Sequence, residues 1–150
     1  MLNNIQLINN NMLVEQTQVM TLSGKKTLEE VLDLFNQGVD IQIQSKHKKN
    51  MLDAVANTRI STSHDFMYIQ QESGEVLIIT PDHRVYDPVK SEWIQAGSVS
   101  KGTHVLNMDK TSCAVVDCHK IKDPVASRVI TLSLSEASGF YANNILVKGN

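Results

Sequence analysis

The segment "EVLIITPDHRV" (residues 75–85) places an apolar run directly before a turn that carries Thr80 and His83. A short run of branched apolar residues predicts a buried strand. The turn would present both side chains to one reacting carbonyl group. Histidine, with an ordinary pKa of ~6.5, exchanges a proton near neutral pH, and a hydroxyl with nearby N–H groups can steady an oxyanion. Taken alone, however, such a short motif is more typical of a solvated turn histidine.

Short segments with a period of two recur along the chain. They predict strands at residues 41–44, 75–85, 103–108, 113–121, 128–135 and 140–147. Turn dipeptides such as Asp123-Pro124 separate them. Many short strands indicate an all-β body. The exception is "TLEEVLDLFNQG", where Thr27 and Glu30 form a capping box and Gly38 ends the pattern, so we expect one short helix at about 27–37.

Length, charge and apolar content exclude several classes of protein. A chain of 150 residues fits one domain and can bury roughly two-thirds of its unfolded surface. The net charge of -2, with scattered Lys and Arg, offers no basic stripe for nucleic acid or for a membrane. No apolar stretch approaches the ~20 residues of a spanning helix, and the first residues lack a signal-peptide pattern. We therefore expect a cytoplasmic monomer, with Cys113 and Cys118 as free thiols.

Asn150, at the end of "FYANNILVKGN" (140–150), is a second candidate for chemistry. The side-chain amide nitrogen of an asparagine can attack its own backbone carbonyl carbon and so cut the peptide bond that follows. An arbitrary chain end is the alternative reading of this position. At the other end, the amide-rich residues 1–11 suggest a flexible leader or flanking segment before a domain at 12–150.

Taken in order, three segments resemble the Hint family, the Hedgehog and intein self-processing domains. The segment "QTQVMTLSGKKTLEEV" (16–31) looks like the strand, turn and helix that follow the first catalytic residue of the family. The segment "TPDHRVYDPVKSEWIQAGSVSKGTHVL" (80–106) is similar to the second block, and "VITLSLSEASGFYANNILVKGN" (129–150) to the two carboxy-terminal blocks. The resemblance spans residues 12–150, and no stretch resembles a homing-endonuclease insertion.

The resemblance implies a horseshoe of short antiparallel strands that breaks its own flanking peptide bonds. Such a domain is an autocatalyst in cis, so it implies no cofactor and no metal, and its partners are the flanking polypeptides of a precursor. On this reading His83 protonates the leaving amide nitrogen at the upstream junction. Thr80 steadies the oxyanion, and Asn150 cyclises at the downstream junction. Both junctions then share one site, so we expect Met12 and Asn150 to lie close to His83.

The chain departs from the family pattern at several positions. Met12 stands where the family has a nucleophilic Cys or Ser, and a thioether cannot form a thioester. Gly149 replaces the penultimate histidine that assists cyclisation. Thr131 and Ser138 replace the aspartate and the histidine of the preceding block. The upstream chemistry would therefore be non-standard, and Thr17, the remaining candidate nucleophile near the start, is more typical of a structural strand residue.

Two further functions stay open. One is a catalytically decayed Hint domain that serves as a spacer or binding module between fused proteins. The other is a β-rich hydrolase that uses Cys118 with a histidine, although no orienting partner is evident. Adjacent Cys118 and His119 would face opposite sides of a strand, which disfavours a metal site. Lys148, His104 or His119 are candidates to replace the lost penultimate histidine.

Overall fold

The structure is a computed structural model that describes residues 17–45 and 52–149. Met12, Asn150 and the predicted leader at 1–11 lie outside these residues. The described elements, in chain order, are β1 (Gln18–Thr21), β2 (Gly24–Thr27), α3 (Leu28–Asn36), β3 (Gln42–Gln44), β4 (Leu52–Gln71), β5 (Val76–Ile79), β6 (Arg84–Asp87), β7 (Glu92–Gln95), the 3-10 turn η1 (Ala96–Ser98), β8 (His104–Leu106), β9 (Ser112–Leu134), β10 (Gly139–Ala142) and β11 (Ile145–Lys148).

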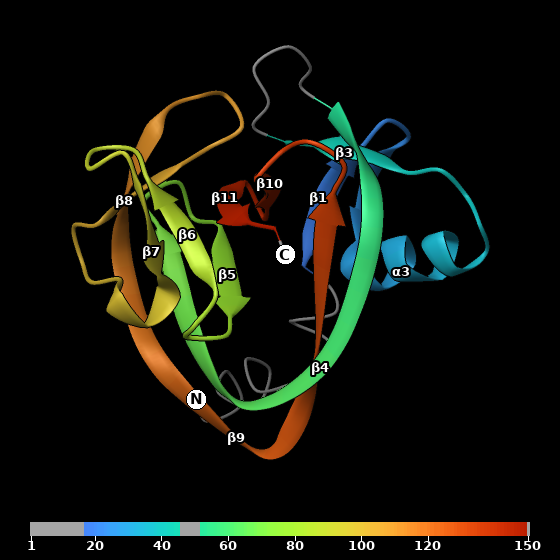
Figure 1. The fold of residues 1–150 in the computed structure, drawn as a ribbon. Coiled ribbons are helices and arrows are strands. Elements are labelled where there is room, and N and C mark those ends of the chain that lie inside the picture. The colour runs from blue at the N-terminus through green and yellow to red at the C-terminus, as the bar shows by residue number, and fades with distance from the viewer. Residues whose placement is uncertain (1–16, 46–51, 150) are drawn as a thin grey trace.

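The strands form two sheets, and every pairing within the described residues is antiparallel. The larger sheet has the order β2-β1-β3-β4-β9-β8, with β5 added to β4, and the smaller has the order β10-β11-β6-β7. In Figure 1, β4 and β9 run together as one curved ribbon whose two arms enclose β10 and β11. The predicted all-β horseshoe with one short helix is confirmed.

The helix forms as its sequence predicts. Thr27 accepts a hydrogen bond from the backbone N–H of Glu30 at 3.1 Å, and the Glu30 carboxylate accepts one from the N–H of Thr27 at 2.9 Å. This capping box satisfies two N–H groups that a helix start otherwise leaves unpaired. Gly38 follows with φ of 80°, a conformation that favours glycine. Leu28, Val31 and Leu32 face the core.

The long strands β4 and β9 differ most from the sequence predictions. β4 spans 20 residues that the sequence did not predict as a strand. β9 spans 23 residues and joins the two strands predicted at 113–121 and 128–135. Asp123-Pro124 lies inside β9, where the pairing with β4 shifts register between Ser63 and Asp65. A bulge accommodates the proline, which explains why the predicted turn does not end the strand.

Two other predicted strands each divide in two. The segment 75–85 forms β5 and β6, which belong to different sheets because the turn at 80–83 separates them. The segment 140–147 forms the hairpin of β10 and β11, with φ of 46° at Asn143 and 67° at Asn144. Asparagine tolerates positive φ, and two such residues make the tight turn that suits a hairpin.

The hairpin turn also joins distant parts of the chain. Asn143 accepts a hydrogen bond from the N–H of Gln18 and donates one to the carbonyl of Val76, both at 2.8 Å. Asn144 accepts from the N–H of Met108 at 2.9 Å and donates to the Glu75 carboxylate at 3.0 Å. The two amides therefore fix β10 and β11 against three other segments.

Asp53, near the start of β4, fixes the segment between β9 and β10. Its carboxylate is buried and accepts from the N–H of Glu136 at 2.8 Å and of Ala137 at 2.7 Å. Its other oxygen accepts from the N–H of Ala54 at 2.9 Å. Hydrogen bonds to a charged acceptor are stronger than neutral ones, so this contact sets where β10 begins.

We expect Asp53→Ala to destabilise the protein by about 2–4 kcal/mol, because it leaves buried N–H groups without an acceptor. The measurement is the free energy of unfolding in urea. Asp65→Ala is the control, since Asp65 is exposed and its carboxylate pairs with the exposed Lys122 at 3.5 Å, and it should cost less than about 1 kcal/mol. Equal losses in the two variants would contradict a structural role for Asp53.

The hydrogen bonds of the Glu75 carboxylate should stabilise the folded protein in a way that depends on pH. The hydrogen bond from Ser73 lowers the pKa of the Glu75 carboxyl below its ordinary value of 4.5, and bonds from Asn144 and Gln71 act in the same direction. A lowered pKa means that the contribution is present above pH 4.5 and is lost as pH falls through the folded-state value.

We therefore expect Glu75→Gln to be less stable than the wild type at neutral pH, with the difference narrowing below pH 4.5. Urea unfolding across a pH series measures this. Glu72→Gln, at a neighbouring exposed carboxylate, serves as the control and should show no such narrowing. A difference for Glu75→Gln that stays constant down to acid pH would show that the charge of Glu75 plays no part.

Candidate functional site

The turn that carries Thr80 and His83 is held from both sides. The N–H of His83 donates to the carbonyl of Thr80 at 3.1 Å and closes the turn. The carbonyls of Pro81 and His83 accept from the N–H groups of Gly97 and Ala96, each at 2.8 Å. A Cβ at Gly97 would lie 3.2 Å from the Cβ of Pro81, so glycine allows this close approach. The Ala-Gly pair of the second block therefore fixes the position of the histidine.

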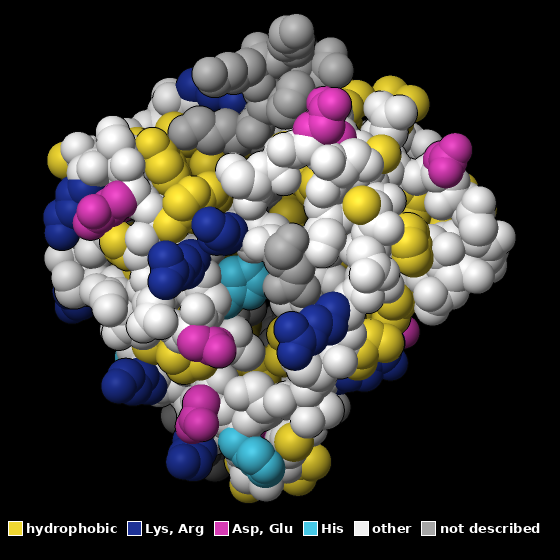
Figure 2. All heavy atoms as spheres, viewed as in Figure 1, with side chains coloured by type: hydrophobic (Ala, Val, Ile, Leu, Met, Phe, Trp, Pro, Cys, Tyr) yellow, Lys and Arg dark blue, Asp and Glu magenta, His cyan; other side chains and the backbone are white. Residues whose placement is uncertain are grey.

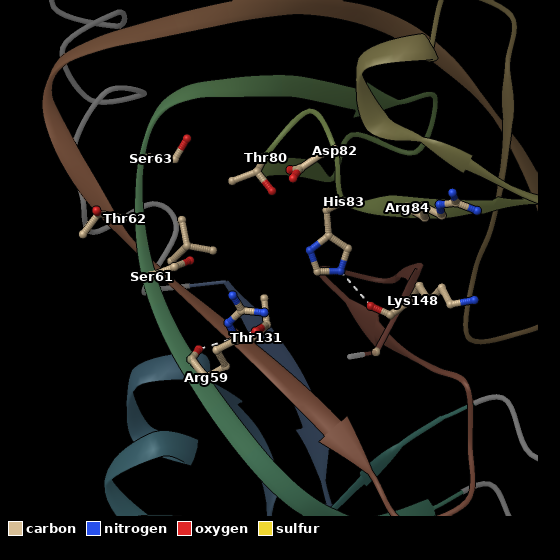
Figure 3. Close-up of a pocket in the computed structure, with 12 residues that line it drawn as sticks. Arg59, Ser61, Thr62, Ser63, Thr80, Asp82, His83, Arg84, Thr131 and Lys148 are labelled. Atoms are coloured by element: carbon tan, nitrogen blue, oxygen red, sulfur yellow. Dashed lines mark hydrogen bonds between the residues drawn. The ribbon is translucent and has the colours of Figure 1, made fainter.

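His83 contacts β11, the last strand that the structure describes. Its Nε2 lies 2.7 Å from the backbone oxygen of Lys148 (Figure 3). β6 and β11 are neighbours in the smaller sheet, with Val85 opposite Val147, which places His83 beside the end of β11. His83, which the resemblance assigned to the upstream junction, contacts the backbone two residues before Asn150.

Gly149 is fixed in a crowded position. Its N–H donates to the carbonyl of Ser138 at 2.8 Å. A Cβ at this residue would lie 3.2 Å from the carbonyl oxygen of Leu132 and 3.5 Å from that of Ser138. A histidine side chain at position 149 would therefore require the neighbouring backbone to shift. The close packing gives a physical reason why glycine suits this position.

A groove of about 390 Å³ lies beside the contact between His83 and Lys148. Thr80 and Gly149 line it, and the strand pair β4 and β9 supplies the opposite wall. Figure 3 shows Arg59 pointing into this space from β4, next to Thr131, while Arg84 and Lys148 point outward along the other rim. The remaining lining residues are Ser61, Thr62, Ser63, Asp82 and Val129.

The start of the described chain also approaches His83. Thr17 is 3% exposed and its carbonyl accepts from the N–H of Leu28 at 2.8 Å, which suits the structural role predicted for it. Thr17, Thr80 and His83 together line a second, small cavity of about 30 Å³. Thr17 and Gly149, near the two ends of the described chain, therefore both lie close to His83. Met12 and Asn150 themselves stand outside the described residues.

The other histidines that the structure describes, and both cysteines, lie outside the groove. His104 bonds through Nδ1 to the Ser112 hydroxyl at 2.8 Å, and the ring of His119 stacks on Tyr68 with centroids 4.7 Å apart. Neither histidine lines the groove. Cys118 donates to the carbonyl of Val99, and both cysteines are free thiols.

His64 lies in β4, and its Nδ1 is 2.8 Å from the carbonyl oxygen of Asp123. Residues 17–45 and 52–149 contain no group of three His, Cys, Asp or Glu side chains that could hold a metal ion. No helix in these ranges is long and apolar enough to cross a membrane.

The ammonium of Lys148 does not face His83. It lies 5.6 Å from the centroid of the Trp93 ring, which packs edge-on against Tyr86 across the β6–β7 hairpin at 5.2 Å. Figure 3 shows the same side chain directed away from the imidazole. Of the candidates to replace the lost penultimate histidine, Lys148 therefore brings its backbone carbonyl to the site rather than its charge.

Sequence reasoning missed the side of the groove that β4 supplies. Arg59 and the hydroxyl residues 61–63 lie in the middle of β4, where side chains on both faces are exposed or half-buried. That stretch carries no alternation of apolar and polar residues, so its sequence pattern does not indicate a strand. The place of Arg84 was missed for another reason. Only the pairing of β6 with β11 brings this side chain to the rim of the groove.

Solved structures with the same architecture are inteins and an intein-like domain. The TvoVMA intein is similar with a TM-score of 0.77 and 16% identity, covering 90% of this chain and 95% of its own. The bacterial intein-like domain from Clostridium thermocellum has a TM-score of 0.76 and 16% identity, with 92% and 97% covered. The gp41-1 intein has a TM-score of 0.72 and 20% identity, with 90% and 95% covered.

No family model matches the sequence, and no curated protein matches it. The relationship is therefore carried by architecture, which the three solved structures share over about nine-tenths of the chain. The chain has the Hint fold of the inteins and bacterial intein-like domains.

Proposed function

We propose that the chain is an autocatalytic self-processing domain that breaks peptide bonds at its own junctions. One observation carries this proposal, namely the 2.7 Å contact of the His83 Nε2 with the Lys148 carbonyl oxygen at the edge of the groove. A side chain able to exchange protons near neutral pH is thereby fixed beside the backbone that leads to Asn150. The fold shared with inteins supports the same class of reaction.

The downstream reaction uses a nucleophile that the chain already carries. In a precursor that continues past Asn150, the side-chain amide nitrogen attacks the backbone carbonyl carbon of Asn150. A C–N bond forms and closes a succinimide ring, while the C–N bond to the next residue breaks. The attacking nitrogen loses a proton and the leaving amine gains one.

His83 is suited to transfer that proton. A carbonyl oxygen only accepts hydrogen bonds, so Nε2 of His83 carries the hydrogen that it donates to Lys148. In the neutral ring Nδ1 is then the basic nitrogen, and in Figure 3 it lies on the side of the ring that faces the groove. His83 would accept the proton there and return it to the leaving amine. It would thus act at the downstream junction, where the penultimate histidine is absent.

Alignment of the reacting groups would supply the rest of the rate enhancement for cyclisation. The hydrogen bonds of Gly149 to Ser138 and of His83 to Lys148 fix the backbone immediately before Asn150. Correct alignment of two groups within one molecule can lower a barrier by several kcal/mol, up to ~7–11 in the best cases. Cyclisation therefore does not require every helper residue of the family.

The upstream junction would follow a different route. Met12 has no proton to lose and cannot form a thioester, so the usual first acyl shift is closed. A nucleophile that follows Asn150 would have to attack the upstream bond directly. Thr80, which lines both cavities at His83, would steady the oxyanion.

The second candidate function is a decayed Hint domain that acts as a spacer or binding module. The observations in its favour are the four substitutions at Met12, Thr131, Ser138 and Gly149, which together remove the upstream nucleophile and three helpers. The two candidates differ in one measurable property, which is whether the bond after Asn150 breaks.

We expect a precursor with a reporter protein after Asn150 to release the reporter during incubation for days. Asn150→Ala should abolish release, because the nucleophile is lost. His83→Ala should slow it by about 10²- to 10⁴-fold, the usual effect of a general acid or base. His83→Gln, which can still donate to Lys148, should be equally slow. Mass spectrometry of the fragment, ending in succinimide or asparagine, identifies the reaction.

His104→Ala is the matched control for these variants, because His104 does not line the groove and should leave the rate unchanged. An intact wild-type precursor, or equal cleavage by Asn150→Ala, would favour the decayed domain. Recovery of the rate in His83→Gln would assign His83 to positioning rather than to proton transfer.

We also expect thiols and hydroxylamine to leave the bond before Met12 intact in the unaltered chain, because no thioester can form there. Incubation of a precursor carrying an upstream reporter with dithiothreitol, followed by mass spectrometry, measures this. Met12→Cys is the matched comparison and should restore thiol-dependent release if position 12 lies where the family has its nucleophile. Release from the unaltered chain would show that the first catalytic position lies elsewhere.

A further inference from the structure

The groove beside His83 carries an excess of positive charge. Arg59, Arg84 and Lys148 line it, against the single carboxylate of Asp82. The whole chain has a net charge of -2, so this local excess is opposite in sign to the protein. Figure 2 shows Lys and Arg side chains on both sides of a histidine near the centre of this face.

The pairing of β6 with β11 places two of these cations next to each other. Val85 lies opposite Val147, so Arg84 and Lys148 occupy the adjoining pair of positions. Like charges directly opposite in a sheet are destabilising. All three cationic side chains are exposed, and none forms an ion pair with another described residue. The ammonium of Lys148 meets the ring of Trp93 at 5.6 Å, so the positive charge without a partner rests mainly on Arg59 and Arg84.

We propose that this groove binds acidic side chains of the polypeptide that follows Asn150 in a precursor. The inference rests on the proposed function, because it assigns a preferred flanking sequence to the same site. Gly149 lines the groove, and three extended residues span about 10 Å, so a flanking segment attached after position 150 is long enough to reach across it. One or two carboxylates among them would lie between the rim formed by Arg84 and Lys148 and the opposite rim at Arg59.

The chemistry of the lining suits a carboxylate. Guanidinium groups bind carboxylates through paired N–H donors, and the hydroxyls of Ser61 and Thr62 add further donors on the β4 side. Asp82 would repel an acidic side chain placed close to it, which directs the carboxylate toward Arg59. A basic flanking segment would meet repulsion from three cations instead.

The test uses precursors in which Asn150→Ala prevents cyclisation, so that binding is measured without cleavage. One carries the flank Gly-Asp-Asp-Gly-Ser-Ser and the other Gly-Asn-Asn-Gly-Ser-Ser, which differ only in charge. We expect the Nε–Hε NMR signals of Arg59 and Arg84 to shift in the acidic precursor relative to the amide precursor. The difference should disappear in ~1 M NaCl, where the screening length is about 3 Å. Identical arginine signals in the two precursors would overturn the proposal.

The matched variants remove one positive charge each. Arg59→Gln should weaken the response of the Arg84 signal to the acidic flank. Lys120→Gln, at an exposed lysine of β9 that does not line the groove, should leave that response unchanged. An equal effect of both variants would mean that the flank senses only the total charge, and would overturn the specific site.

Precursors that retain Asn150 separate this inference from the proposed function. We expect the acidic flank to be released about three- to tenfold faster than the amide flank, in line with the modest strength of exposed ion pairs. Equal release of both flanks would overturn the preference and leave self-cleavage standing. If neither flank is released, self-cleavage fails, and the arginine signals still decide whether the groove binds acidic segments.

Discussion

The backbone ladder between β4 and β9 is the constraint on which the rest of the structure depends. It runs from the pair Val55 and Leu134 to the pair Gln71 and Val115, with register shifts along its length. Residues from both ends of this ribbon pack in the same main hydrophobic core, whereas residues 56–65 in the middle of β4 are exposed or half-buried. Both ends can reach one core only if the ribbon bends, and the bend produces the horseshoe seen in Figure 1. The middle of β4 is held by its pairing with β9, whose own side chains Ile130 and Leu132 are buried in the core.

Closure of the horseshoe assembles the candidate site from segments that are far apart in sequence. Asp53 fixes the start of β10, and Asn143 and Asn144 fix the hairpin that follows. β11 then lies beside β6, and its last carbonyl meets His83. The histidine is thus positioned by backbone contacts on both sides, which leaves Nδ1 of the ring free for chemistry under the proposed function.

Two positions explain how a chain with few of the family's helper residues could still process itself. Gly149 fits where a larger residue would press on the carbonyl of Leu132, and His83 contacts the same stretch of backbone from the other side. A general acid or base that approaches from β6 does not need a side chain at position 149. Arg84 and Lys148, which occupy adjoining positions at the rim of the groove, would then serve together with Arg59 to bind the segment that is cut away.

The sequence by itself determined the helix, the two-residue periodicity of the core strands and the turn with Thr80 and His83. Each of these depends on neighbours a few residues away, such as the capping pair Thr27 and Glu30 or the apolar run before Thr80. Only the tertiary structure decided that β4 is a strand, because its exposed middle has no apolar pattern and is stabilised by hydrogen bonds to β9. The same holds for the contact of His83 with Lys148 and for the place of Arg59, since these residues meet only after the long ribbon has bent.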